Sequence, residues 1–188
     1  MKKEFKEALD NSPVIAAIKD EEGLARCSTC ESQVVFILYG DICNISDIVD
    51  QIKATGKLAF VHIDLITGLS SKEIAVDFIR KYTKADGIIS TKPNLVKRAK
   101  ELGFYTILRL FVIDSMAYEN IEKQQRSAHP DVIEILPALM PKVIQRICST
   151  TRTPVIAGGL ISSKEDILDL LDAGATSISS TNPQIWFL

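Results

Sequence analysis

Eight short apolar runs recur along the chain, and this repeat restricts the fold more than any other feature. The runs cover residues 13–18, 34–39, 58–64, 87–90, 105–113, 132–136, 154–157 and 176–180. They are mostly continuous rather than alternating, which is typical of strands buried on both faces of a parallel sheet. The stretches between them have the pattern of helices, so we expect strands and helices to alternate.

Helix ends are marked between several of these runs. The motif Ser-x-x-Glu occurs at residues 70–73 and 162–165. It predicts capping boxes, in which the serine and the glutamate bind free N–H groups of a first helical turn. Gly103 and Gly174 stand where the helices after the fourth and seventh runs should end.

Eight alternating units predict a closed, TIM-like (β/α)8 barrel. One domain then covers residues 1–188, with a short leading helix within residues 1–12. The fold usually needs about 250 residues, so the loops must be short. The last helix must be truncated, because only the segment "NPQIWFL" follows Thr181. The alternative is an open doubly wound sheet, which would need fewer strands.

The chain also partly repeats itself. The segment "GLSSKEIAVDFIRKYTKADGIIST" (68–91) resembles "GGLISSKEDILDLLDAGATSISST" (158–181). The two segments lie four units apart, as two half-barrels would. Convergence of similar units on similar helix starts is an equally good explanation, and both explanations are consistent with a barrel.

Composition excludes several classes of protein. Hydrophobic residues make up 46% of the 188 residues, which excludes a disordered chain. No apolar run approaches the roughly 20 residues that span a bilayer. The opening "MKKEFKEALDNSP" lacks the apolar core of a signal peptide. We therefore expect a cytoplasmic protein with no membrane partner.

The cysteines give a weaker signal. Cys27 and Cys30 form a C-x-x-C pair, but the pair does not begin a helix after a thioredoxin-type strand. No second pair and no nearby histidine completes a zinc site. We expect structural or incidental cysteines, no metal and no cofactor.

Small residues end the last two strands, which are neighbours in a barrel. Gly158 and Gly159 would let backbone N–H groups approach a ligand, and Ser179, Ser180 and Thr181 add hydroxyl donors. A short helix beginning near Asn182 would direct its positive end to the same place. TIM barrels commonly bind phosphate there, so we predict a phosphate site. A tight turn and a helix cap are the structural alternative.

Other polar residues fall at the same rim of the barrel and form the rest of the predicted ligand site. Lys19 and Lys92 end the first and fourth strands, and Lys19 could reach the phosphate. We expect His62 and Asp64 to share one face of the third strand. Arg109 and Glu134 lie on neighbouring strands, where they bind a ligand or form a structural ion pair.

Basic residues gather in the middle of the sequence. Residues 92–152 contain ten Lys and Arg against six Asp and Glu, although the whole chain has a net charge of −2. Three helices that are adjacent in a barrel carry most of them. We predict a backbone contact for RNA there, with a solvated face as the alternative. The residues are Lys97, Arg98, Lys100, Lys123, Arg126, Lys142 and Arg146.

The strings "PVIAAIKD", "VHIDLITGLS", "DGIISTK", "RLFVIDSMA", "IEILPALMPKVI" and "PVIAGGLISSKED" resemble the glycerol uptake operon antiterminator regulatory proteins. The resemblance is ordered and runs from residue 13 to residue 186. It implies a barrel that senses glycerol 3-phosphate and acts on the leader of a messenger RNA to prevent premature termination. It implies a ligand site made of ten of these rim residues: Lys19, His62, Asp64, Lys92, Arg109, Glu134, Gly158, Gly159, Ser180 and Thr181. "LPALMP" departs from the pattern at Ala138, where we expect a glycine.

Three hypotheses therefore stand. The first is a non-catalytic regulator that responds to glycerol 3-phosphate, binds a leader mRNA and could form a homo-oligomer. The second is an isomerase, lyase or phosphodiesterase of a small sugar or glycerol phosphate, with His62, Asp64 and Glu134 as acid–base groups. The third is a barrel that only stores or scaffolds.

Overall fold

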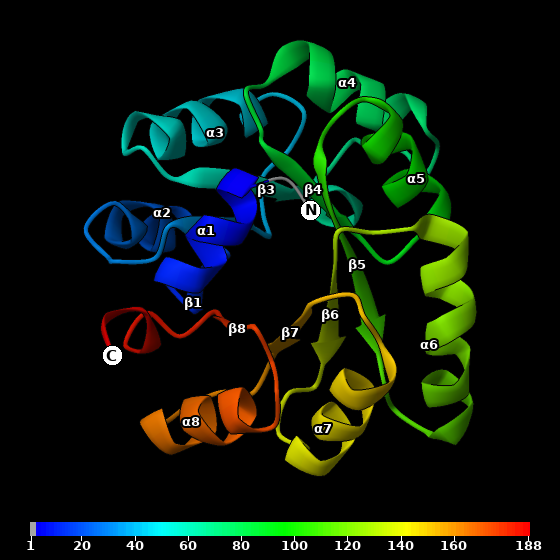
Figure 1. Cartoon of the computed structure of the whole chain (residues 1–188). Coiled ribbons are helices and arrows are strands. Elements are labelled where there is room, and N and C mark those ends of the chain that lie inside the picture. The colour runs from blue at the N-terminus through cyan, green and yellow to red at the C-terminus, as the bar shows by residue number, and fades with distance from the viewer. Residues whose placement is uncertain (1–2) are drawn as a thin grey trace.

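Eight parallel strands close into a barrel in the computed structural model, which describes residues 3–188 (Figure 1). Each strand pairs with its sequence neighbour, and β8 pairs with β1. The predicted (β/α)8 barrel is confirmed, and the open sheet is excluded. The strands are β1 (Val14–Ile18), β2 (Val34–Ile37), β3 (Leu58–His62), β4 (Gly87–Ser90), β5 (Tyr105–Phe111), β6 (Val132–Leu136), β7 (Val155–Gly158) and β8 (Ser177–Ser180).

A helix precedes the barrel, and seven more connect consecutive strands in the described chain. They are α1 (Lys3–Asn11), α2 (Glu21–Cys27), α3 (Ile45–Ala54), α4 (Ile74–Tyr82), α5 (Pro93–Glu101), α6 (Ser115–Ala128), α7 (Pro141–Thr150) and α8 (Lys164–Asp172). The predicted leading helix corresponds to α1, except that residues 1 and 2 lie outside the described residues.

The chain leaves the barrel differently from the prediction in two places. β3 ends at His62, and Ile63–Leu65 form a 3-10 turn, η1, so Asp64 does not share a strand face with His62. After β8 the predicted truncated last helix is a 3-10 helix, η2 (Ile185–Phe187), which begins three residues after Asn182, where the short helix was expected to begin. Trp186 Nε1 donates to the Ser180 carbonyl over 2.7 Å and holds η2 against the barrel.

The predicted capping boxes were both wrong in detail. At α8 the box is Ser163 with Asp166, one residue later than predicted, because the acidic side chain that reaches back is Asp166. α4 begins at Ile74, and its N-cap residue Glu73 makes no side-chain cap hydrogen bond. The predicted helix stops hold: Gly103 and Gly174 have φ of +82° and +98°, which glycine adopts readily.

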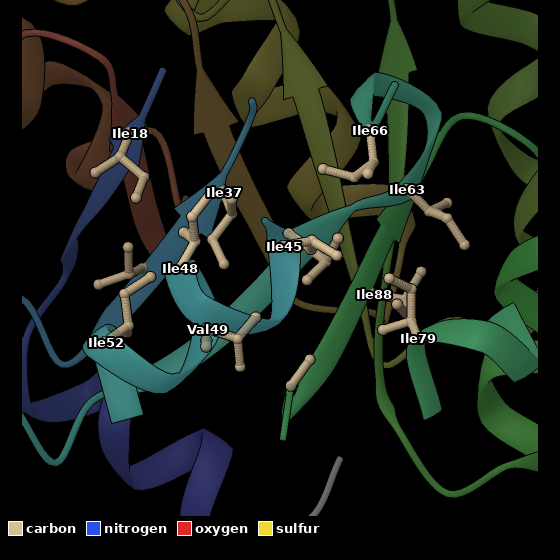
Figure 2. Packing of buried hydrophobic residues seen from close by; sticks show 14 of the residues in the cluster. Ile18, Ile37, Ile45, Ile48, Val49, Ile52, Ile63, Ile66, Ile79 and Ile88 are labelled. Carbon is tan, nitrogen blue, oxygen red and sulfur yellow. The ribbon is translucent and has the colours of Figure 1, made fainter. Parts of the chain in front are cut away.

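Helices pack their apolar sides against the outer faces of the strands. Ile45, Ile48 and Ile52 of α3 belong to one buried cluster with Ile18 on β1 and Ile37 on β2 (Figure 2). All of these side chains are buried. Burial of this kind stabilises by about 25 cal/mol per Å² of apolar surface, and it fixes the ring of helices around the sheet.

The amino-terminal helix fills the end of the barrel where the strands begin. α1 lies across this end (Figure 1), and the Phe5 ring centroid is 4.7 Å from that of Phe60 and 5.1 Å from that of Tyr105. The Tyr105 hydroxyl donates to Glu4 over 3.0 Å. Because side chains of α1 plug this end, a ligand can approach the barrel axis only from the carboxyl ends of the strands.

Inward-facing residues change character along the barrel axis. The lower layers are apolar and include Phe36, Phe60, Ile107 and Ile156. The layer nearest the carboxyl ends is polar instead and contains His62, Arg109, Glu134 and Ser179, all buried. Buried polar groups need partners, so the contacts within this layer define the candidate site.

Candidate functional site

An ion pair between neighbouring strands forms the floor of the open mouth. Arg109 on β5 and Glu134 on β6 are register partners. Arg109 Nε donates to Glu134 Oε2 over 2.6 Å, and Nη2 donates to Oε1 over 3.2 Å. This two-point geometry lets both charges be buried. The predicted pairing of these residues is observed.

Gly158 lets a third side chain reach this pair. Ser179 on β8 donates its hydroxyl to Glu134 Oε1 over 2.6 Å, although β7 lies between β8 and β6. A Cβ at Gly158 would lie 2.5 Å from Ser179 Oγ and 2.9 Å from Glu134 Oε1. The contact between β6 and β8 side chains therefore requires a glycine here.

A cavity of about 360 Å³ opens above the floor at the ends of β6, β7, β8 and β1. Its size suits a small molecule rather than a nucleotide chain. Polar groups from the floor and from two loops converge on it. The residues that line it are Ala17, Leu38, Arg109, Glu134, Leu136, 159–162 and 179–182.

The loops after β7 and β8 turn tightly at this cavity. Gly159 and Leu160 have φ of +83° and +65°, the left-handed region that is strained for leucine. In the next loop Ser180 Oγ accepts a hydrogen bond from the Asn182 N–H over 3.1 Å, which leaves Thr181 exposed at the bend. Backbone N–H groups in turns of this kind form concavities that bind anions.

Lys19 lies beside the cavity rather than in it. It is exposed after β1 and lines a neighbouring hollow of about 430 Å³. Ala17, Thr181 and Asn182 line both spaces. The ammonium group is thus near the loop after β8 and contributes positive charge on its outer side.

A second cluster surrounds Asp64, on η1. Asp64 Oδ2 accepts from the Ser90 hydroxyl over 2.9 Å and from the Thr91 N–H over 2.8 Å. Lys92 Nζ is 3.1 Å from Asp64 Oδ1, close enough for an ion pair though not aligned as a hydrogen bond. Burial alone would raise the pKa of Asp64, but the contacts with Thr91, Ser90 and Lys92 together hold that pKa below its ordinary value.

His62 lies below this cluster and is 3% exposed. Its Nδ1 has no hydrogen-bond partner among the described residues, and Asp64 Oδ2 is 3.9 Å away. Burial, followed by the positive charge of Arg109, lowers the pKa of His62 from 6.5 to about 4. The imidazole is therefore neutral at pH 7.

The structure divides the predicted ligand residues into two groups. Five of them line one cavity: Arg109, Glu134, Gly159, Ser180 and Thr181. Gly158 supports that cavity from within β7, and Lys19 stands beside it. His62, Asp64 and Lys92 form the separate cluster at the ends of β3 and β4 and are not part of the cavity wall.

Sequence reasoning missed two features of the site. Ser179 was predicted as a hydroxyl donor to the phosphate, but its hydrogen bond to Glu134, which the missing side chain of Gly158 makes possible, was not predicted. Leu160 carries no chemical signal in the sequence, and only the backbone angles place it at the cavity.

The basic helices are partly neutralised by local partners. Arg98 pairs with Asp77 at 2.6 Å, and Arg126 pairs with Glu122. Lys100 donates to the His129 carbonyl over 2.5 Å. Within the described chain, four exposed members of the set form no ion pair and retain their full charge for an external partner: Lys97, Lys123, Lys142 and Arg146.

Two of the four cysteines, Cys27 and Cys30, are buried, whereas Cys43 is exposed and Cys148 is partly buried. Cys27 and Cys30 are free thiols, and burial raises the pKa of Cys27 to about 11. An unreactive thiol is expected from such a shift. No cluster of three His, Cys, Asp or Glu suited to a metal occurs among residues 3–188. No described helix is long and apolar enough to cross a membrane.

Known proteins resemble the chain over nearly its whole length. A family profile described as "Glycerol-3-phosphate responsive antiterminator" matches residues 14–186. "Uncharacterized protein YgcP" of Escherichia coli is 47% identical over 180 residues, which are 96% of this chain and 94% of that protein.

Two solved structures are also similar. One is a glycerol uptake operon antiterminator regulatory protein from Listeria monocytogenes, with a TM-score of 0.90 and 31% identity, covering 94% of this chain and 95% of that chain. The other is a glycerol uptake operon antiterminator-related protein from Thermotoga maritima, with a TM-score of 0.81 and 35% identity, covering 93% and 98%.

Proposed function

The chain belongs to the glycerol-3-phosphate responsive antiterminator family, and we propose that it is a regulator that binds glycerol 3-phosphate and acts on the leader of a messenger RNA. In this proposal the ligand is an effector and not a substrate. A nascent transcript as partner places the protein in the cytoplasm. The observation that carries the proposal is the cavity between the Arg109–Glu134 pair and the loops after β7 and β8.

The phosphate group would bind at the loop end of the cavity. The backbone turns at Gly159 and Thr181 supply N–H donors, and the side chain of Asn182 adds a polar group. Lys19 adds positive charge from the outer side of the loop after β8. A phosphate monoester offers three acceptor oxygens to such donors.

The hydroxyl end of the ligand would then face the floor. Glu134 can accept from a ligand hydroxyl, and Arg109 keeps three of its five N–H donors outside the contacts with Glu134. The pair has no net charge, so it suits a neutral diol. A second anionic group would meet the Glu134 carboxylate in a buried setting, where like charges repel strongly.

The contacts of the predicted acid–base groups favour a regulator over an enzyme. Asp64 is held by Ser90 and Thr91, and Glu134 is held by Arg109 and Ser179. A catalytic acid or base usually has a pKa near the working pH. Asp64 and His62 instead have lowered pKa values, which keep the carboxylate charged and the imidazole neutral.

Calorimetric titration tests the ligand. We expect glycerol 3-phosphate to bind, 3-phosphoglycerate to bind at least tenfold more weakly, and glycerol not to bind measurably. Gly159→Ala should weaken binding at least tenfold, because it strains the backbone that presents the N–H groups. Gly56→Ala is the matched control: Gly56 also has a positive φ of +79°, but its Cβ would meet open space at the other end of the barrel.

RNA binding is tested separately with leader RNA from the operon that contains the gene. We expect glycerol 3-phosphate to raise RNA affinity, which requires that the ligand prefers the RNA-binding state. Lys97→Glu and Lys123→Glu should each weaken RNA binding severalfold, and the exposed Lys6 on α1 serves as the control for charge reversal. Turnover of glycerol 3-phosphate, or RNA affinity that ignores the ligand, would contradict the proposal.

A further inference from the structure

Large apolar side chains are exposed at the open mouth of the barrel, on the loops after β5, β6 and β7, at the end of β5 and in the first turn of α6. Ile113 is 80% exposed, Leu160 is 72% exposed and Met116 is 70% exposed. Phe111 and Leu139 are about half exposed. We call these five residues the apolar rim. Single exposed apolar residues are ordinary, but a cluster of them marks an interaction site.

Backbone hydrogen bonds join the three loops, so the apolar rim lies on adjoining segments of the chain. The Val112 N–H, after β5, donates to the Leu136 carbonyl over 2.8 Å. The Ala138 N–H, after β6, donates to the Gly159 carbonyl over 3.3 Å. The loops after β5, β6 and β7 therefore lie side by side.

A groove of about 720 Å³ between α6 and α7 continues this surface. Ile113, Tyr118 and Met140 give it an apolar base. Its charges are separated: Glu119 belongs to the α6 wall, and Lys142 belongs to the α7 wall. A further acid, Asp114, precedes α6, and a further base, Arg146, lies on α7 with its guanidinium 5.1 Å from the Tyr118 ring centroid.

We propose that a second copy of this chain docks on the apolar rim and this groove, related by a two-fold axis. A two-fold axis places the α6 wall of one copy against the α7 wall of the other, so acids meet bases twice. The groove has as many acids as bases, which does not suit an RNA backbone or an anionic membrane. Exposed Met, Phe and Ile beside Tyr and Arg match the composition of protein interface cores.

Sedimentation equilibrium of the full chain from 1 to 200 µM tests the proposal. The mass should approach twice the monomer mass of 20.8 kDa. Ile113→Glu should raise the dimer dissociation constant at least tenfold. Ile74→Glu is the matched control, because Ile74 is 67% exposed at the start of α4, away from the apolar rim. A monomer at all concentrations, or equal effects of the two substitutions, would overturn the proposal.

Charge reversal tests the two-fold arrangement itself. Glu119→Lys and Lys142→Glu should each weaken self-association severalfold, because like charges then face each other twice. An equimolar mixture of the two variants should regain wild-type association, since each interface again pairs opposite charges. Failure of the mixture to regain it would overturn the arrangement, and so would loss of RNA binding by Ile113→Glu without any change in mass.

Discussion

The β3–β4 unit and the β7–β8 unit end in turns of the same geometry, but different groups lie against the two turns. After β4, Ser90 Oγ accepts from the Lys92 N–H over 3.0 Å, and after β8, Ser180 Oγ accepts from the Asn182 N–H over 3.1 Å. The loops after β3 and β7 also share a glycine at positive φ, +89° at Gly68 and +83° at Gly159. The internal sequence repeat therefore corresponds to a repeated backbone geometry.

The difference lies in what precedes that glycine. His62 and Gly158 occupy equivalent register positions. The glycine with positive φ comes six residues after His62, at Gly68, but directly after Gly158, at Gly159. The extra residues include η1, which delivers the Asp64 carboxylate to Ser90 and Thr91. In the β3–β4 unit the Asp64 carboxylate binds the turn after β4, whereas in the β7–β8 unit the turn after β8 lines the cavity. This contrast is the best internal argument for an anion site at Thr181.

Gly158→Ala should cause the largest loss of stability. In the β7–β8 unit Ser179 reaches Glu134 because Gly158 has no side chain, whereas the β3–β4 unit carries His62 at the equivalent position. The new Cβ would separate Ser179 from Glu134. Overpacking together with loss of a charged hydrogen bond should cost about 4 kcal/mol. Urea denaturation measures this cost. Gly103→Ala is the control, with positive φ but open space around its Cβ, and equal losses in both variants would refute the explanation.

Acidification should act through the β3–β4 unit. His62 has a pKa of about 4 in the folded state against 6.5 when unperturbed. Between these values the unfolded chain binds a proton that the folded chain does not, so stability falls as pH falls, by up to about 3 kcal/mol. Asp64, Glu134 and Arg109 face the same group and act on its pKa.

Thermal unfolding of wild type and His62→Asn from pH 7 to pH 4.5 measures this dependence. The variant should lose most of the slope. An unchanged slope would mean that folding does not lower the pKa of His62 and would contradict the prediction.

The two units differ in how readily their geometry follows from sequence. Strands β1 to β8 were predictable because continuous apolar runs have few other solutions in a short chain. The exit from β3 was not, since Ile63 and Leu65 prolong the apolar run and hide the turn that carries Asp64. The contact between Ser179 and Glu134 depends on register across three strands, which no local pattern encodes. Adjacent serines and acids at residues 162–166 similarly hid which pair caps α8.

Removal of the Asp64 carboxylate should leave the turn after β4 without an internal anion, like the turn after β8. Asp64→Ala leaves the Thr91 N–H and the Ser90 hydroxyl without their acceptor, at a cost of about 2 kcal/mol. Inorganic phosphate should then stabilise the variant more than the wild type in thermal unfolding. Asp64→Asn keeps an acceptor and should respond less. No gain from phosphate would refute the equivalence of the two turns.

The smallest expected effect is a difference in stability between substitutions of two serines on β8. Ser179→Ala removes a hydrogen bond to Glu134 and should cost about 1 kcal/mol. Ser177→Ala should cost nothing measurable, because Ser177 Oγ is buried without a hydrogen-bond partner among the described residues. Urea midpoints compare the two, and weakened glycerol 3-phosphate binding should accompany only Ser179→Ala. A larger loss for Ser177→Ala would contradict the role given to Ser179.

The pairing of β8 with β1 has a consequence for biosynthesis. Val14 to Ala16 remain an unpaired strand edge until Ile178 to Ser180 have been made, some 160 residues later. At 5–20 residues per second the ribosome needs roughly 8 to 30 seconds for that stretch. Throughout this interval the nascent chain exposes an apolar edge that invites aggregation, so a stop codon before residue 177 would leave that edge permanently open.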